Sequence, residues 1–179
     1  MKIKTTKTVA ELLNKIHSTE SRILSITTNI ETELEVIVAD YFSKGDFEDY
    51  KLFSHLFYGN EAKLTFSQKI KIFEKFLKKV YPSYLKTNKD FINSLERVRK
   101  IRNKFAHHIN PRQSELNDYV GKDNFPLHYV EDGLPKSEIF SWKVIMERFK
   151  DFENILNETK KIMNYCQTIY RLKSKSKKL

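Results

Sequence analysis

Residues that break helices are rare in this chain and gather in one stretch. The 179 residues include only four glycines and four prolines, and five of these eight lie between residues 110 and 137. Glycine and proline disfavour helix interiors, so the sequence on either side of that stretch can form long helices. The many lysine, glutamate, leucine and isoleucine residues favour the same structure. The chain is therefore predicted to be mainly helical.

Outside that stretch, apolar residues recur every three or four positions, which is the spacing of one face of an α-helix. Several segments show this spacing between residues that commonly cap helices. The segments are residues 8–17, 19–44, 46–57, 67–80, 90–109 and 141–172. We therefore predict an all-α helical bundle of five or six helices, with one irregular insertion before the last long helix.

The insertion, about residues 110–137, has a different pattern. Apolar and other residues alternate along 125–129, which is a weak signal for a β-strand. Asp132 and Gly133 form a pair that is typical of turns. The pattern allows a small β-hairpin here. A connection of this length in a compact domain is unusual and is often functional.

The chain is strongly basic, with a formal net charge of +10 and an isoelectric point near 9.5. A cationic surface attracts polyanions, of which nucleic acid is the first candidate and an anionic membrane the second. A lysine-rich surface that binds no polyanion is the alternative. The segment RLKSKSKKL at residues 171–179 is of low complexity, and we expect residues 173–179 to be a basic disordered tail that can add phosphate contacts.

The cysteine count and the hydropathy of the N-terminal residues bear on disulfide bonds, zinc sites and membrane segments. Cys166 is the single cysteine, so neither an internal disulfide nor a cysteine-rich zinc site can form. A single cysteine suits a reducing cytosol. The first 18 residues hold no apolar run long enough for a signal peptide or a membrane span. We expect a cytoplasmic protein with no membrane association, no cofactor and no metal.

The stretch RVRKIRNKFAHHINP, residues 97–111, places polar residues among large apolar ones. A helix turns about 100° per residue, so Arg102 falls inside the apolar stripe that includes Val98 and Phe105. A buried guanidinium is costly unless an acceptor meets it. Two interpretations stay open. Arg102 pairs with an acid on another helix, or it faces a cleft or a second subunit, where its planar fork suits a phosphate.

Asn103 and His107, four residues apart, lie together on a second side of the same helix, and Glu96 precedes them on that side. A histidine changes charge near neutral pH and can move protons. Asn103 is placed to hydrogen-bond His107 and to orient it. Lys104 and His108 lie on a third side.

The segment IRNKFAHH resembles the Arg-polar-x-x-x-His signature of the HEPN superfamily, in the form Arg-Asn-x-x-Ala-His. Two earlier segments, LTFSQKIKIFEKFL and SRILSITTNIETELEVIVADYF, are similar to one branch that includes mannitol-repressor-like proteins. The resemblance spans roughly residues 20–110, whereas residues 111–136 match no family pattern. By position, the motif residues are Arg102, Asn103 and His107, and His108 offers a second, longer spacing.

The resemblance implies a single HEPN-like helical domain over residues 1–172 that forms a homodimer. It also implies a metal-independent endoribonuclease whose catalytic residues are Arg102, Asn103 and His107, with Glu96 and His108 as accessory residues. Such a protein acts as a toxin or in phage defence, with an antitoxin or defence protein as partner. Further basic residues near the motif are candidates for RNA binding. They are Arg99, Lys100, Lys104, Arg112 and Lys122.

Two alternatives remain at this point. Several relatives in the mannitol-repressor-like branch act as regulators without known catalysis, so a non-catalytic regulator is the first. The second is a dimerisation module in which Arg102 pairs with an acid and His107 packs. A buried ion pair of Arg102 in a monomer would favour the second alternative, whereas Arg102 and His107 open to a basic cleft at a two-fold axis would favour the ribonuclease.

Overall fold

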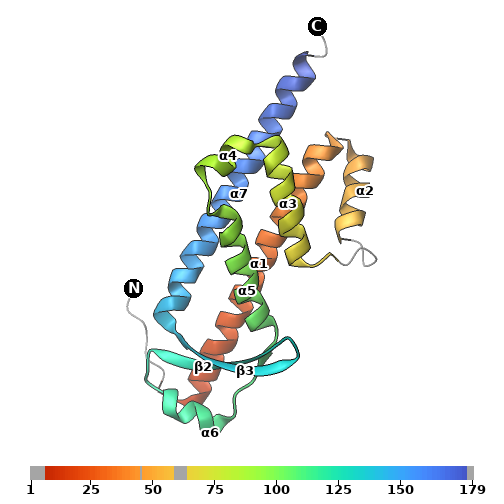
Figure 1. Ribbon diagram of the computed structural model, residues 1–179. Helices are drawn as coiled ribbons and strands as arrows, with labels where there is room; N and C mark the ends of the chain where they lie inside the picture. The colour runs from red at the N-terminus through yellow and green to blue at the C-terminus, as the bar shows by residue number, and fades with distance from the viewer. Residues whose placement is uncertain (1–6, 45, 59–63, 177–179) are drawn as a thin grey trace. The chain divides into compact units, whose positions relative to one another are not determined.

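The computed structural model describes residues 7–44, 46–58 and 64–176 (Figure 1). It is mostly helical, with a small antiparallel sheet before the last helix, as the sequence predicts. The helices are α1 (Val9–Ser43), α2 (Phe47–Tyr58), α3 (Phe66–Val80), α4 (Pro82–Thr87), α5 (Phe91–Ala106), α6 (Gln113–Leu116) and α7 (Trp142–Ser176), with a 3-10 turn η1 (Asn117–Tyr119). The strands are β1 (His108–Ile109), β2 (Asn124–Glu131) and β3 (Leu134–Ser141).

The helix boundaries differ from the prediction at the start of the chain. The two helices predicted over residues 8–17 and 19–44 form one continuous helix, α1. Ser18 does not cap a helix because the buried apolar stripe runs through this point, from Ile16 to Ile23. The packing of that stripe outweighs the weak preference of serine for helix ends.

Later parts of the chain also differ from the prediction. The predicted end of α3 at Val80 is confirmed, but Pro82 then begins a short helix that was not predicted, α4, where its missing N–H costs nothing. Helix α5 ends at Ala106, three residues before the predicted end. Helix α7 continues to Ser176, so residues 173–176 of the expected disordered tail are helical, and residues 177–179 lie outside the described residues.

The described residues divide into two compact units. The first unit consists of residues 7–27 and 100–152. The second unit consists of residues 28–44, 46–58, 64–99 and 153–176. Helices α1, α5 and α7 contribute residues to both.

The first unit holds the sheet, whose strand order is β1-β2-β3 with both pairs antiparallel. Asp132 and Gly133 join β2 to β3 and have φ angles of 53° and 76°. A two-residue hairpin loop with two positive φ angles favours this Asp-Gly pair. The predicted turn and hairpin are therefore confirmed.

The core of the first unit forms where β2 meets the helices. Phe125, Leu127 and Tyr129 alternate along β2 and are buried, and the Phe125 ring stacks on Trp142 at 4.2 Å between centroids. The Phe105 ring of α5 meets Phe140 of β3 edge to face at 5.7 Å. In Figure 1 the hairpin crosses the N-terminal half of α1. Contacts of Lys104 and Phe105 with β3 hold the end of α5 against the sheet, and His108 of β1 lies beside Glu20 of α1.

In the second unit, α3 begins with a capping box. The Thr65 hydroxyl accepts from the Gln68 N–H, and the Gln68 side chain accepts from the Thr65 N–H at 2.7 Å. The face of α3 that carries Phe73 is buried, and Phe76 meets Tyr41 of α1 edge to face at 5.3 Å. These contacts leave the opposite face of α3 exposed.

Polar contacts inside the second unit add specificity. Lys69 of α3 donates to Glu31 of α1 at 2.6 Å and also pairs with Glu35. Tyr84 donates to Glu158 of α7 at 2.9 Å.

Cys166 is buried, and burial raises the pKa of its thiol to about 11. A thiol in that state is a poor nucleophile at neutral pH.

Candidate functional site

Arg102 lies near the end of α5 in the first unit and is half-buried. Its Nη1 donates to Asn103 Oδ1 at 3.5 Å, which is a weak interaction between neighbours. Within the described part of the chain, no carboxylate lies within ion-pair distance of its guanidinium. The structure therefore does not contain the intrachain ion pair that a purely structural role for Arg102 would require.

His107 directly follows α5 and is exposed. Its backbone N–H donates to the Asn103 carbonyl at 3.1 Å, so the helical hydrogen-bond pattern continues for one more residue. Its carbonyl accepts from the Val130 N–H of β2, also at 3.1 Å. The backbone of His107 is thus held on both sides while its imidazole is open to solvent.

The expected contact between Asn103 and His107 is not present. Asn103 Oδ1 accepts from Arg102, and among residues 7–44, 46–58 and 64–176 no hydrogen bond joins the Asn103 side chain to His107. The two residues remain one helical turn apart because their backbones are hydrogen-bonded. The Asn103 side chain therefore contacts the arginine of the motif and not its histidine.

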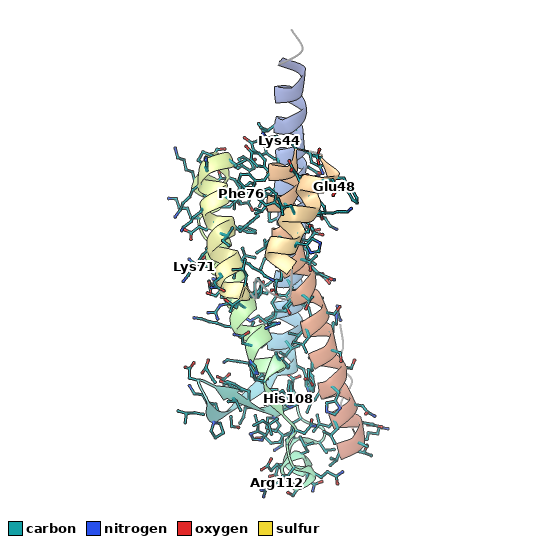
Figure 2. All side chains as sticks on the ribbon, turned by 90° about the vertical axis from the view of Figure 1, so that its right-hand side faces the viewer. Lys44, Glu48, Lys71, Phe76, His108 and Arg112 are labelled. Atoms are coloured by element: carbon teal, nitrogen blue, oxygen red, sulfur yellow. The ribbon has the colours of Figure 1, made fainter. Side chains whose placement is uncertain are left out.

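His108 lies in different surroundings from His107. It is the first residue of β1. Its side chain is 2% exposed, and its Nδ1 lies 3.3 Å from Glu20 Oε2 of α1. Figure 2 shows His108 turned toward the interior of the first unit. Burial lowers the pKa of His108, and the Glu20 carboxylate opposes that shift.

Two further histidines gather around His108 in the first unit. His17 of α1 is joined to Asn110 at 2.9 Å through Nε2 and Oδ1, and His128 Nε2 of β2 lies 3.3 Å from Glu115 Oε2 of α6. A charge on either histidine would lower the pKa of His108 further. We call His17, His108 and His128 the histidine cluster.

Sequence reasoning missed this cluster because its members are up to 111 positions apart and have no spacing typical of metal ligands. The fold brings them together by pairing β1 with β2, where Ile109 is opposite His128. No group of three or more His, Cys, Asp or Glu side chains within the described ranges is arranged to hold a metal ion.

The predicted accessory and RNA-binding residues belong to different units of the structure. Glu96 and Arg99 lie in the second unit, where Arg99 Nε donates to Glu96 Oε2 at 2.7 Å. In the first unit, Lys100, Arg112 and Lys122 are exposed. Exposed cations of this kind can meet phosphate, whereas Arg99 already has an anionic partner.

Lys104 is also engaged within the protein. Its ammonium donates to both carboxylate oxygens of Glu138 at 2.6 and 2.7 Å, and the buried Tyr129 donates to the same carboxylate at 2.6 Å. Burial alone would lower the pKa of Lys104, but the hydrogen bond and charge of Glu138 raise it above its usual value. Lys104 therefore anchors α5 to the sheet, and its charge is neutralised there.

No protein-family model, curated protein or solved structure matches the chain. Among the residues that the structure describes, no helix is both long and apolar enough to cross a membrane. What the site can do therefore follows from its own geometry. An arginine that pairs with no carboxylate of the described residues lies close in sequence to an exposed histidine, and these groups can bind a phosphate and transfer a proton.

Proposed function

We propose that the chain is a metal-independent endoribonuclease of HEPN type that cuts RNA by attack of the RNA's own 2′-hydroxyl. The observation that carries this proposal is the state of Arg102 and His107. Arg102 has no carboxylate partner in the described part of the chain, and His107 is exposed on a fixed backbone. The Arg-Asn-x-x-Ala-His resemblance adds support.

The chemistry uses few groups. The 2′-oxygen attacks the adjacent phosphorus, the bond to the 5′-oxygen breaks, and the products are a 2′,3′-cyclic phosphate and a 5′-hydroxyl. His107 takes the proton of the 2′-hydroxyl or delivers one to the leaving 5′-oxygen. Arg102 binds the non-bridging phosphate oxygens and stabilises the charge that builds on them.

A homodimer completes this site. Five residues along a helix correspond to a turn of about 500°, so Arg102 and His107 of one copy lie about 140° apart around the axis. A two-fold axis beside the end of α5 would bring together two arginines and two histidines. One histidine then accepts a proton while the other donates one.

The biological role that fits this activity is a toxin or a phage-defence effector, restrained by an antitoxin or a defence partner. The non-catalytic regulator remains the alternative. The dimerisation module, in which Arg102 pairs with an acid of its own chain, is disfavoured because no carboxylate among the described residues forms an ion pair with Arg102.

The test is cleavage of total RNA by the purified protein with EDTA present, followed by analysis of the RNA ends. The proposal predicts 2′,3′-cyclic phosphate and 5′-hydroxyl ends. The Arg102→Lys variant keeps the charge and loses the planar fork, so its rate should fall by about 10²–10³-fold. Activity that needs an added divalent metal, or equal activity in this variant, would support the regulator instead.

A further inference from the structure

The excess of positive charge is concentrated in a few short segments of the chain. Residues 66–89 contain seven lysines and one glutamate, a net charge of +6. Residues 171–179 contain five basic residues and no acidic one, a net charge of +5. Since the whole chain carries +10, all other residues together have a net charge of −1. The basic character is therefore a local property and not a general feature of the surface.

Within the first of these segments, the lysines of α3 lie on one face. At about 100° per residue, Lys71, Lys75, Lys78 and Lys79 fall within an arc of about 100°. We call these four lysines the basic face. They are all exposed, and the buried stripe of α3 lies on the opposite side of the helix. Figure 2 shows Lys71 on the outer side of α3 and Phe76 on the side toward α1.

Most lysines of this segment have no anionic partner. Lys78 pairs with Glu74 at 2.7 Å within α3. The exposed lysines that form no ion pair or hydrogen bond with any part of the described chain are Lys71, Lys75, Lys79, Lys86 and Lys89. Like charges held this close together repel one another, so a bound polyanion would relieve that repulsion.

We propose that the basic face binds the phosphate backbone of RNA and delivers the chain to its substrate. From Lys71 to Lys79 the helix rises about 12 Å, a length along which several phosphates of one strand can be met. That the polymer is RNA rests on the proposed function. The polyanion itself is inferred from the charge and geometry of α3.

The surface around the basic face distinguishes nucleic acid from a membrane. A helix that lies on a bilayer inserts large apolar side chains beside its basic ones. The exposed large apolar residues of the described chain all lie outside residues 66–89. The neighbours of the lysines on the outer side of α3 include Ser67 and Gln68, which are polar. A surface of cations without apolar anchors suits phosphates in water.

The experiment compares two triple variants with the same loss of charge. The first, Lys71→Gln, Lys75→Gln and Lys79→Gln, neutralises three lysines of the basic face. The matched control, Lys143→Gln, Lys150→Gln and Lys160→Gln, removes three exposed lysines that are spread along α7. The probe is a fluorescent 2′-O-methyl RNA of about 20 nucleotides. It lacks the 2′-hydroxyl nucleophile, so binding is measured without cleavage.

We expect wild-type affinity to fall steeply with salt. The triple variant of the basic face should bind at least about tenfold more weakly at low salt, with a log–log slope smaller by about 2, since each phosphate contact on a single strand contributes about 0.7. The α7 variant should change the slope by less than half as much. Equal losses in the two variants, or no loss in the first, would overturn the inference. So would binding to phosphatidylserine vesicles in preference to the RNA.

The two proposals fail in different ways. If the catalytic proposal is wrong, His107→Ala cuts RNA as well as wild type, yet the variant of the basic face still loses binding. If the basic face does not bind RNA, the triple variant of the basic face binds the probe as well as wild type, while His107→Ala still loses cleavage. Circular dichroism of each variant excludes loss of folding as the cause, because glutamine is a good helix former at exposed positions.

Discussion

Two neighbouring histidines, His107 at the open end of α5 and His108 in β1, lie in different surroundings. At the end of α5, His107 is exposed and Arg102 has no carboxylate partner in the described chain. One residue later, His108 is enclosed, with Glu20 beside it. Burial and neighbouring charged groups, more than residue type, therefore decide which of the two histidines is accessible from solvent.

The largest expected effect is at Arg102, the cation of the open region. Arg102→Ala should lower the RNA cleavage rate by at least about 10²–10³-fold, because no other group of the site replaces the planar fork. The variant should remain folded, because no carboxylate among the described residues would lose an ion-pair partner. Single-turnover cleavage together with thermal melting checks both parts. If Arg102→Ala melted at a much lower temperature but its folded fraction cleaved RNA at the wild-type rate, Arg102 would have a structural role and not a catalytic one.

The next effect is on stability and concerns the enclosed region. His108→Ala removes a side chain that is 2% exposed and leaves Glu20 without its histidine. We expect a loss of about 1–3 kcal/mol in the free energy of unfolding, measured by urea denaturation. His107→Ala is the matched control and should change that free energy by less than about 0.5 kcal/mol, because its side chain is exposed.

A pH dependence of stability should come from the same residue. Burial holds the pKa of His108 below its usual value of 6.5 in the folded protein, so the unfolded chain binds the proton first as pH falls. The free energy of unfolding should therefore fall as pH drops below about 6.5, and this contribution should vanish above that pH. Urea denaturation across this range should show a weaker dependence in His108→Gln. An unchanged profile in that variant would mean that other groups control the effect.

The smallest effect tests the electrostatics of the cluster. The Glu20 carboxylate raises the pKa of His108 against the larger effect of burial. Glu20→Gln should therefore lower the pKa of His108 further, as measured by NMR titration of the imidazole. An upward shift would show that the carboxylate is not the group that opposes burial.

Much of the fold follows from periodicity in the sequence. The long helices and the Asp132-Gly133 hairpin are confirmed by the structure. The early end of α5 could not be predicted, because the pairing of His107 with Val130 depends on a strand more than 20 residues away. The break predicted between residues 8–17 and 19–44 is wrong for the opposite reason, since local preference was given more weight than a continuous buried stripe.

The sequence predicted only part of the candidate site. The motif identified Arg102 and His107, but the absence of an acid near Arg102 depends on the placement of every carboxylate around α5. The partners of His108 were not foreseen, because Glu20 and His128 become its neighbours only through the fold. Local patterns thus indicated the candidate residues, and tertiary packing decided which of them are enclosed.

The central claim is that the exposed histidine is the catalytic one. Its most direct test measures cleavage of total RNA in EDTA by His107→Ala and His108→Gln, side by side and at a temperature where both are folded. We expect the cleavage rate of His107→Ala to fall by at least about 10²-fold, whereas His108→Gln should retain most of its activity. Full activity of His107→Ala, or loss confined to His108→Gln, would contradict the account.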